Sequence, residues 1–228
     1  VYTILHAGGK FGGGGYKIAG GLHGVGASVV NALSEWLELE DIYEGEVYTE
    51  RYERGHVARA FCHVGSAGEK RHGVKVTFKP DPEIFEETVF DYDTLLNRMR
   101  EQAFLNAGVR IVLVDTRGED TIENDLCFEG GIRSFVAYHN EQRHEEVVHP
   151  DVIYMRGEKG TSVAEVAMQY NCSYYENMLT FANNMHTIEG GTHETGFKSA
   201  LTKVLNAYGK SKGYLKGDEV LSGEDSRE

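Results

Sequence analysis

The spacing of apolar residues changes from helical to extended and back along the chain, which predicts a mixture of helices and strands. Between Gly24 and about Leu37, apolar residues recur every three or four positions, as in a helix with one buried face. Short segments rich in aromatic and β-branched residues follow, separated by Glu44-Gly45 and Arg54-Gly55, as in antiparallel strands joined by tight turns. The expected strands are 38–42, 46–52, 56–61 and 74–78.

The rest of the chain mixes the same two element types without a repeating β-α-β unit. Asp93 or Thr94 is a suitable cap for a helix that ends near Asn106-Ala107-Gly108. Glu129-Gly130-Gly131 interrupts the pattern, and we place a domain boundary there, between residues 1–129 and 130–228. This order of elements favours an α+β architecture. The other expected elements are strands over 109–114, 121–128, 152–156, 162–170 and 176–183, and helices over 132–139 and 193–208.

The stretch from Gly12 to Leu33, GGGGYKIAGGLHGVGASVVNAL, places eight glycines ahead of the first helical segment. Glycines let backbone N–H groups approach a ligand closely, and a helix that begins after them offers unpaired N–H groups. This combination suits an anion, most often a phosphate. Lys10 and Lys17 flank the glycines and add positive charge.

Two common phosphate-binding motifs do not fit these glycines. A Walker-type loop requires a glycine five residues before the Gly-Lys pair and Ser or Thr after it, whereas Gly9-Lys10 is preceded by Ile4 and followed by Phe11. A Rossmann fingerprint beginning at Gly24 has Val29 where its third glycine belongs. Both alternatives are therefore excluded.

The glycine segments "HAGGKFGGGGYK" and "GGLHGVGASVVNALS" are similar to the ATP lid and second glycine motif of the bacterial type II topoisomerase ATPase subunits. The chain resembles the DNA gyrase B family in particular, with the topoisomerase IV counterpart a near relative. The resemblance continues through "FKPDPEIFEE", "REQAFLNAGVRI", "FEGGIRSFV" and "EGGTHETGFKSALTKVLNAY", so it covers essentially the whole chain. It implies part of a gyrase/chaperone/kinase-type (Bergerat) ATPase domain over 1–129, followed by an α+β transducer domain over 130–228.

The resemblance also implies the roles of individual residues. In the family the lid closes over ATP when two subunits dimerise, so Lys10 is expected at the γ-phosphate and Tyr16 at the adenine end. Backbone N–H groups of the second glycine motif are expected at the phosphates, and the His23 side chain near the γ-phosphate. The motif consists of Gly21, Leu22, His23, Gly24, Val25 and Gly26.

Several parts of the family's machinery are not matched by any residue of the chain. The resemblance places the general base and the Mg²⁺-binding asparagine upstream of Val1, and the transducer lysine beyond Glu228. We therefore expect an internal fragment that holds no catalytic residue and does not hydrolyse ATP by itself. Where relatives commonly have Gly-Thr, with the hydroxyl in the adenine network, this chain has Gly73-Val74.

The implied function is that of DNA gyrase, in which ATP binding and hydrolysis drive DNA strand passage and negative supercoiling. The implied partners are the breakage–reunion subunit (DNA gyrase A), double-stranded DNA and a second copy of the ATPase region. Two alternatives stay open: the topoisomerase IV ATPase subunit, which decatenates DNA, and a non-catalytic dimerisation module.

Composition adds limits to this interpretation. The net charge of −13 gives the chain no general attraction for DNA, and no stretch approaches the roughly 20 apolar residues of a membrane span. The three cysteines, Cys62, Cys127 and Cys172, are widely spaced, which favours buried or half-buried free thiols in a reducing cytoplasm. The histidines form no metal-binding pattern with carboxylates, so no metal site is expected.

Overall fold

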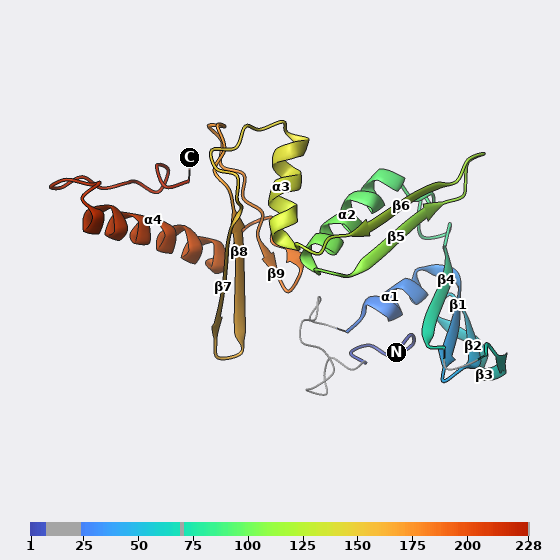
Figure 1. Ribbon diagram of the computed structural model, residues 1–228. Coiled ribbons are helices and arrows are strands. Elements are labelled where there is room, and N and C mark those ends of the chain that lie inside the picture. Colours follow the sequence, from blue (N-terminus) through green and yellow to red (C-terminus); the bar gives the residue numbers. More distant parts are fainter. Residues whose placement is uncertain (8–23, 69–70, 228) are drawn as a thin grey trace. The chain divides into compact units, whose positions relative to one another are not determined.

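The computed structural model describes residues 1–7, 24–68 and 71–227 of the chain (Figure 1). Helices and antiparallel sheets are mixed along the sequence, which confirms the α+β prediction. The chain forms two compact units, Val1–Phe90 and Asp91–Glu228. The functional boundary predicted between residues 129 and 130 falls inside the second unit and stays a prediction.

The first unit is built on a four-stranded antiparallel sheet with the strand order β3-β2-β1-β4. The predicted strands are confirmed, and two-residue turns join β1 to β2 and β2 to β3. Both residues of each turn have positive φ, as in the type I′ turns that match the twist of a hairpin. The strands are β1 (Ser34–Tyr43), β2 (Glu46–Glu53), β3 (His56–Ser66) and β4 (Gly73–Pro80).

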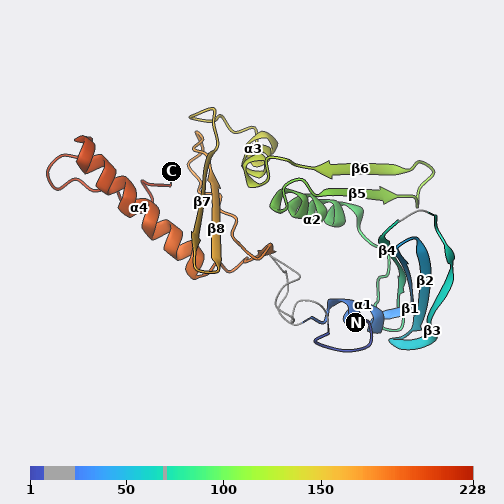
Figure 2. The same ribbon diagram turned by 60° about the horizontal axis from the view of Figure 1, so that its bottom comes forward.

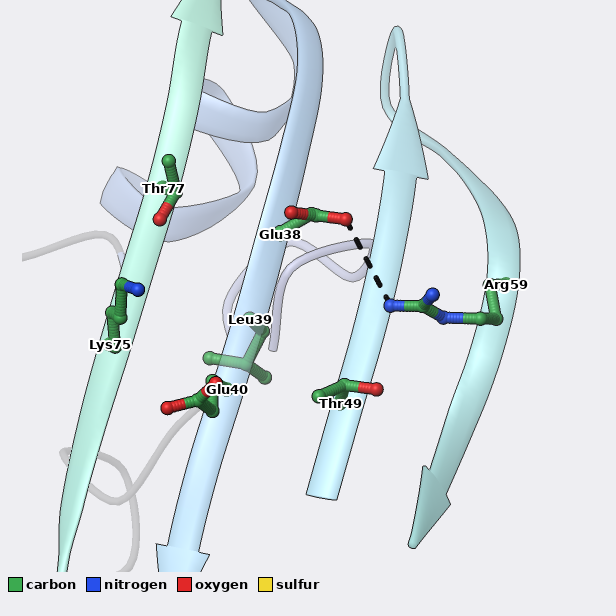
Figure 3. A pocket seen from close by; sticks show the side chains of 7 residues that line it. All are labelled: Glu38, Leu39, Glu40, Thr49, Arg59, Lys75 and Thr77. Carbon is green, nitrogen blue, oxygen red and sulfur yellow. Dashed lines mark ion pairs between the residues drawn. The ribbon is translucent and has the colours of Figure 1, made fainter. Parts of the chain in front are cut away.

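The two faces of this sheet differ in polarity. Leu37 of β1 lies opposite Tyr52 on one neighbouring strand and Phe78 on the other, so the three side chains share a face. Leu37 and Tyr52 are buried, on the side of the sheet where helix α1 (Gly26–Ala32) packs against β1. The alternate positions form a charged face that points away from α1 (Figure 3).

Helix α1 is shorter than predicted, because the chain enters β1 at Ser34 instead of continuing as a helix to Leu37. Trp36 and Leu37 continue the helical spacing of the apolar residues, but they pair with strands on both sides of β1. The sheet gives this segment hydrogen bonds on two edges and buries Leu37 completely, which overrides the local helical pattern.

In the second unit, helix α2 (Tyr92–Leu105) lies along the hairpin of β5 (Arg110–Asp115) and β6 (Ile122–Cys127) (Figure 2). Its cap is Asp91, not Asp93 or Thr94 as predicted, because the Asp91 carboxylate accepts a hydrogen bond from the Thr94 N–H at 2.8 Å. The remaining elements are α3 (Ile132–Gln142), β7 (Ile153–Lys159), β8 (Ser162–Met168), β9 (Phe181–Ala182), β10 (Met185–His186) and α4 (Thr192–Lys212).

The core of the second unit is an aromatic cluster around Phe104. This side chain is 1 % exposed, and its ring centroid lies 3.7 Å from that of Phe128 and 4.7 Å from that of Phe135. Tyr138 of α3 contacts Phe104 as well, at 5.4 Å between ring centroids. The cluster therefore joins α2, the end of β6 and α3 into one packed core.

Two further predictions were wrong. The strand expected over 176–183 is reduced to the two residues of β9, because only Phe181 and Ala182 find strand partners, in β10. The three cysteines are free thiols but exposed, not buried or half-buried.

We predict that Leu37→Ala lowers the free energy of unfolding by about 2–5 kcal/mol, since it removes a completely buried side chain and leaves a cavity. The measurement is chemical denaturation, and Val57→Ala on the edge strand of the same sheet is the matched control. Val57 is 50 % exposed, so its truncation should cost no more than about 0.5 kcal/mol. Equal losses for the two variants would contradict the assignment of Leu37 to the core.

Candidate phosphate-binding site

The N-terminal end of α1 presents backbone N–H groups that have no acceptor among the described residues. The first hydrogen bond of the helix joins the Val29 N–H to the Val25 carbonyl at 2.8 Å, so the amides before Val29 have no partner within the helix. Ser28 uses its hydroxyl to donate to the same carbonyl at 2.9 Å. Among the described residues, no side chain caps these amides.

The glycines of this segment meet the steric demands of a bound anion. Gly24 has φ +59°, in the left-handed region that favours glycine, and turns the chain into the helix. A Cβ built on Gly26 would meet nothing within 4 Å in the described structure, so the space on the side-chain side of this residue is open there. Because α1 has only seven residues, the open N–H groups contribute more than a helix dipole. The arrangement fits a phosphate oxygen.

The structure brings together three of the predicted site residues, Gly24, Val25 and Gly26, at the start of α1. The other predicted contacts lie outside the described residues. These are Lys10, Tyr16, Gly21, Leu22 and His23.

Asn31 fixes the position of α1 through hydrogen bonds to two backbone carbonyls. Its side chain is 1 % exposed, and its Nδ2 atom donates to the carbonyls of Tyr2 at 3.0 Å and Gly55 at 3.3 Å. Gly55 has φ +82°, and a Cβ there would come within 3.4 Å of Ala32 Cα, so the turn between β2 and β3 approaches the helix closely. These contacts fix the helix against that turn.

Asp81 stabilises the C-terminal end of α1. Its N–H donates to the Leu33 carbonyl at 3.1 Å, just after the helix, and its carboxylate accepts from Arg54 Nε at 2.8 Å and from the Glu83 N–H at 2.9 Å. The side chain is almost completely buried. The hydrogen bond from the Glu83 N–H and then the Arg54 guanidinium hold the pKa of the Asp81 carboxyl below its usual value of 3.8.

Sequence reasoning missed Asn31, Arg54 and Asp81 as residues that position the glycine motif. Asp81 stands between two prolines directly after a strand, which predicted only the end of that strand. Arg54 adopts a positive φ of 46° in a turn that was predicted, but nothing local indicated its buried partner. Their contacts span 24 to 29 residues for Asn31 and 27 residues for Arg54, so local patterns did not reveal them.

Two cavities elsewhere in the structure contain none of the predicted site residues. The charged face of the sheet carries a cavity of about 80 Å³ between Glu38, Glu40, Arg59 and Lys75, with an ion pair of 3.9 Å from Arg59 to Glu38 (Figure 3). This volume holds a few water molecules but no nucleotide.

The second cavity, of about 380 Å³, lies between α2 and α3. Arg100, Tyr138 and His139 are among the residues that line it, and Arg100 lies over the Tyr138 ring at 5.4 Å. Burial, and then the nearby Arg143, lower the pKa of His139, so its imidazole is neutral at neutral pH.

The described ranges offer neither a metal site nor a membrane span. Within them, no group of three His, Cys, Asp or Glu side chains is arranged to hold a metal ion. None of the helices in those ranges is long and apolar enough to cross a membrane.

Comparisons with known proteins point to one family. The DNA gyrase B family profile matches residues 131–228. The DNA gyrase B protein of Clostridium acetobutylicum is 56 % identical over the whole chain, and that of Enterococcus faecalis is 50 % identical. The chain spans 35 % of the length of each of these curated relatives.

Solved structures agree with the sequence comparisons. The 43K ATPase domain of Thermus thermophilus gyrase B, solved with an aminocoumarin, matches with a TM-score of 0.78 at 39 % identity. The match covers 89 % of this chain and 54 % of that one. The gyrase B protein of Myxococcus xanthus matches with a TM-score of 0.72 at 25 % identity, covering 82 % of this chain and 53 % of that one.

We predict that Asp81→Asn destabilises the protein in a pH-dependent manner. Because the pKa of Asp81 is lowered in the fold, ionised Asp81 gives its full stabilisation above the ordinary value of 3.8, and this is lost as the pH falls through the lowered value. The difference in unfolding free energy between wild type and variant should therefore be largest near neutral pH and shrink below about pH 4.

The unfolding free energies of wild type and variant are measured by denaturant titrations across this pH range. Glu83→Gln is the matched control, since it removes the charge of the other, exposed carboxylate bound to Arg54. Glu83 Oε1 lies 2.6 Å from Arg54 Nη2. A difference for Asp81→Asn that stays constant down to about pH 2 would contradict the role of the ionised carboxylate.

Proposed function

Because the chain belongs to the DNA gyrase B family, we propose that it is part of the ATPase subunit of DNA gyrase. In this proposal the longer protein uses ATP binding and hydrolysis to drive DNA strand passage and negative supercoiling. The observation that carries the proposal is the open N-terminal end of α1, with Gly24 in the left-handed conformation and Gly26 sterically open, inside a chain similar to gyrase B throughout.

The proposal assigns the glycine motif to the phosphates of ATP. Gly21, Leu22, His23, Gly24, Val25 and Gly26 contribute backbone N–H groups, Lys10 meets the γ-phosphate and Tyr16 the adenine end. The amides at the start of α1, which have no acceptor within the described part of the chain, support this assignment for Gly24, Val25 and Gly26. Mg²⁺ accompanies the nucleotide and is held by a residue upstream of Val1.

The proposal divides the chain into the C-terminal part of an ATP-binding domain, residues 1–129, and a transducer domain, residues 130–228. The family profile, which begins at residue 131, supports this division. The proposed partners are the breakage–reunion subunit (DNA gyrase A), double-stranded DNA and a second copy of the ATPase region, in the cytoplasm. The names of the curated relatives favour gyrase over topoisomerase IV.

The isolated 228-residue chain does not hydrolyse ATP under this proposal, because none of its residues matches the family's general base. ATP turnover by the purified chain should equal that of its Lys10→Ala variant. Turnover above that control would overturn this part of the proposal without affecting the assignment to gyrase.

The direct test uses the longer gene product that contains this chain, paired with the matching breakage–reunion subunit, on relaxed plasmid. The proposal expects negative supercoiling that requires ATP. Lys10→Ala should abolish supercoiling, because the γ-phosphate contact is lost, while leaving the melting temperature unchanged.

Other outcomes assign the protein differently. ATP-dependent relaxation or decatenation without supercoiling would indicate topoisomerase IV. No topological change with an active partner subunit would contradict both enzymatic assignments and favour a non-catalytic dimerisation module.

We predict that Val74→Thr tightens nucleotide binding by the longer protein about fivefold, since a hydroxyl contact to a ligand is worth about 1 kcal/mol. Val74 is 65 % exposed on β4, so the substitution should not disturb the core. Calorimetric titration with a non-hydrolysable ATP analogue measures the effect. Val57→Thr on the edge strand is the control, and equal affinities for wild type and Val74→Thr would argue against an adenine contact at position 74.

A further inference from the structure

The hairpin of β9 and β10 ends in a two-residue turn, Asn183-Asn184, whose backbone is left-handed at both positions. The φ angles are +48° and +64°, as in a type I′ turn, and asparagine tolerates this conformation better than most residues. Asn183 makes no side-chain hydrogen bond within the described structure. Asn184, in contrast, reaches a helix that lies about eighty residues earlier in the sequence.

Three side-chain amides meet at this point, and we call them the amide clasp: Gln102, Asn106 and Asn184. Asn184 Nδ2 donates to Asn106 Oδ1 at 2.7 Å, and Gln102 Nε2 donates to the backbone carbonyl of Asn184 at 3.2 Å. Asn106 Nδ2 in turn donates to the backbone carbonyl of Gln102 at 2.8 Å. The turn is thereby fixed to the C-terminal end of α2, where Asn106 is the C-cap residue.

The amide clasp lies beside the aromatic cluster. Phe104 is on the same turn of α2 as Gln102, and Phe135 connects the cluster to Phe181 of β9, at 6.4 Å between ring centroids. His186 of β10 faces Glu101 of α2 at 3.9 Å. The hairpin therefore contacts α3 through an apolar contact and α2 through polar ones.

The two kinds of contact constrain the hairpin differently. Apolar burial is non-directional, so the aromatic cluster holds the elements together but permits small sliding movements. Hydrogen bonds require a defined distance and angle, so the amide clasp fixes the position of the turn along α2. The chain leaves α2 at Asn106 and enters β5 at Arg110, so a shift of the clasp also moves the start of β5.

We infer that Asn184 is a positioning residue that couples ATP hydrolysis to DNA strand passage, an inference that rests on the proposed function. Gln102 and Asn106 belong to the part of the chain assigned to the ATP-binding domain, and Asn184 to the part assigned to the transducer. The amide clasp holds these parts in one relative orientation, so that a movement of α2 is carried into the β9–β10 hairpin. Loss of the clasp leaves the aromatic cluster, and with it the folded core, in place.

The test compares Asn184→Gly with Asn183→Gly in the longer protein, paired with its breakage–reunion subunit. Both substitutions keep a residue that accepts positive φ, but only the first removes the hydrogen bond to Asn106. The readout is the number of ATP molecules hydrolysed per supercoil introduced, measured together with the melting temperature. A purely structural contact would change the melting temperature but not this ratio.

We expect Asn184→Gly to raise the ratio about twofold or more, the lower end of the effect of mutations that alter coupling between sites. Asn183→Gly should leave the ratio unchanged. Asn184→Asp, which keeps the size of the side chain but replaces the donating amide with an acceptor facing Asn106 Oδ1, should raise the ratio as well.

An unchanged ratio in Asn184→Gly and Asn184→Asp overturns the inference, whatever the melting temperatures are. An equal rise in Asn183→Gly overturns it too, because the turn conformation and not the clasp would then be responsible. If the unsubstituted protein hydrolyses ATP but introduces no supercoils, the proposed function fails first and the coupling role fails with it. If the longer protein introduces supercoils and the ratio of ATP hydrolysed per supercoil is the same in wild type and variants, the proposed function stands and the coupling role of Asn184 fails.

Discussion

The buried carboxylate of Asp81 is the constraint on which the first unit depends. The carboxylate binds Arg54 in the turn between β2 and β3, and the backbone N–H of Asp81 donates to the Leu33 carbonyl at the end of α1. A buried carboxylate is stable only when charged and polar partners surround it, so the helix, the turn and the end of β4 have to meet at this residue. Asn31 adds a second tie to the same turn through the Gly55 carbonyl. With its C-terminal end fixed in this way, α1 presents its N-terminal amides in a defined direction.

The second unit depends on an apolar constraint instead. Phe104 is almost completely buried between Phe128 and Phe135, and these rings join α2, the hairpin of β5 and β6, and α3. The residues assigned to the ATP-binding domain and to the transducer therefore share one core across residue 130. A shared apolar core keeps the two parts together, and the directional contacts at its edge determine how they are oriented.

Local signals predicted much of the fold. The strands of the sheet and the turns at Glu44-Gly45 and Arg54-Gly55 follow from alternation and turn chemistry, both of which act over a few residues. The predicted end of α1 was wrong because Leu37 is buried by sheet pairing, and the helical spacing of apolar residues carries no information about that pairing. The contacts of Asn31, the ion pair between Arg54 and Asp81, and the contacts of Asn184 with α2 could not be predicted, since each joins residues 24 to 82 positions apart. Of the residues predicted to bind phosphate, only those at the start of α1 are described, and their conformation agrees with the physical expectation for a glycine followed by a helix.

The most direct test of this account is amide hydrogen exchange at the start of α1, measured in the longer protein with and without a non-hydrolysable ATP analogue and Mg²⁺. If these amides bind phosphate, the N–H groups of Gly24, Val25, Gly26 and Ala27 should exchange markedly more slowly with the nucleotide, while those of the edge strand β3 should not change. Unchanged exchange at the start of α1, under conditions where nucleotide binding is shown by calorimetry, would contradict the assignment of this segment to the phosphates.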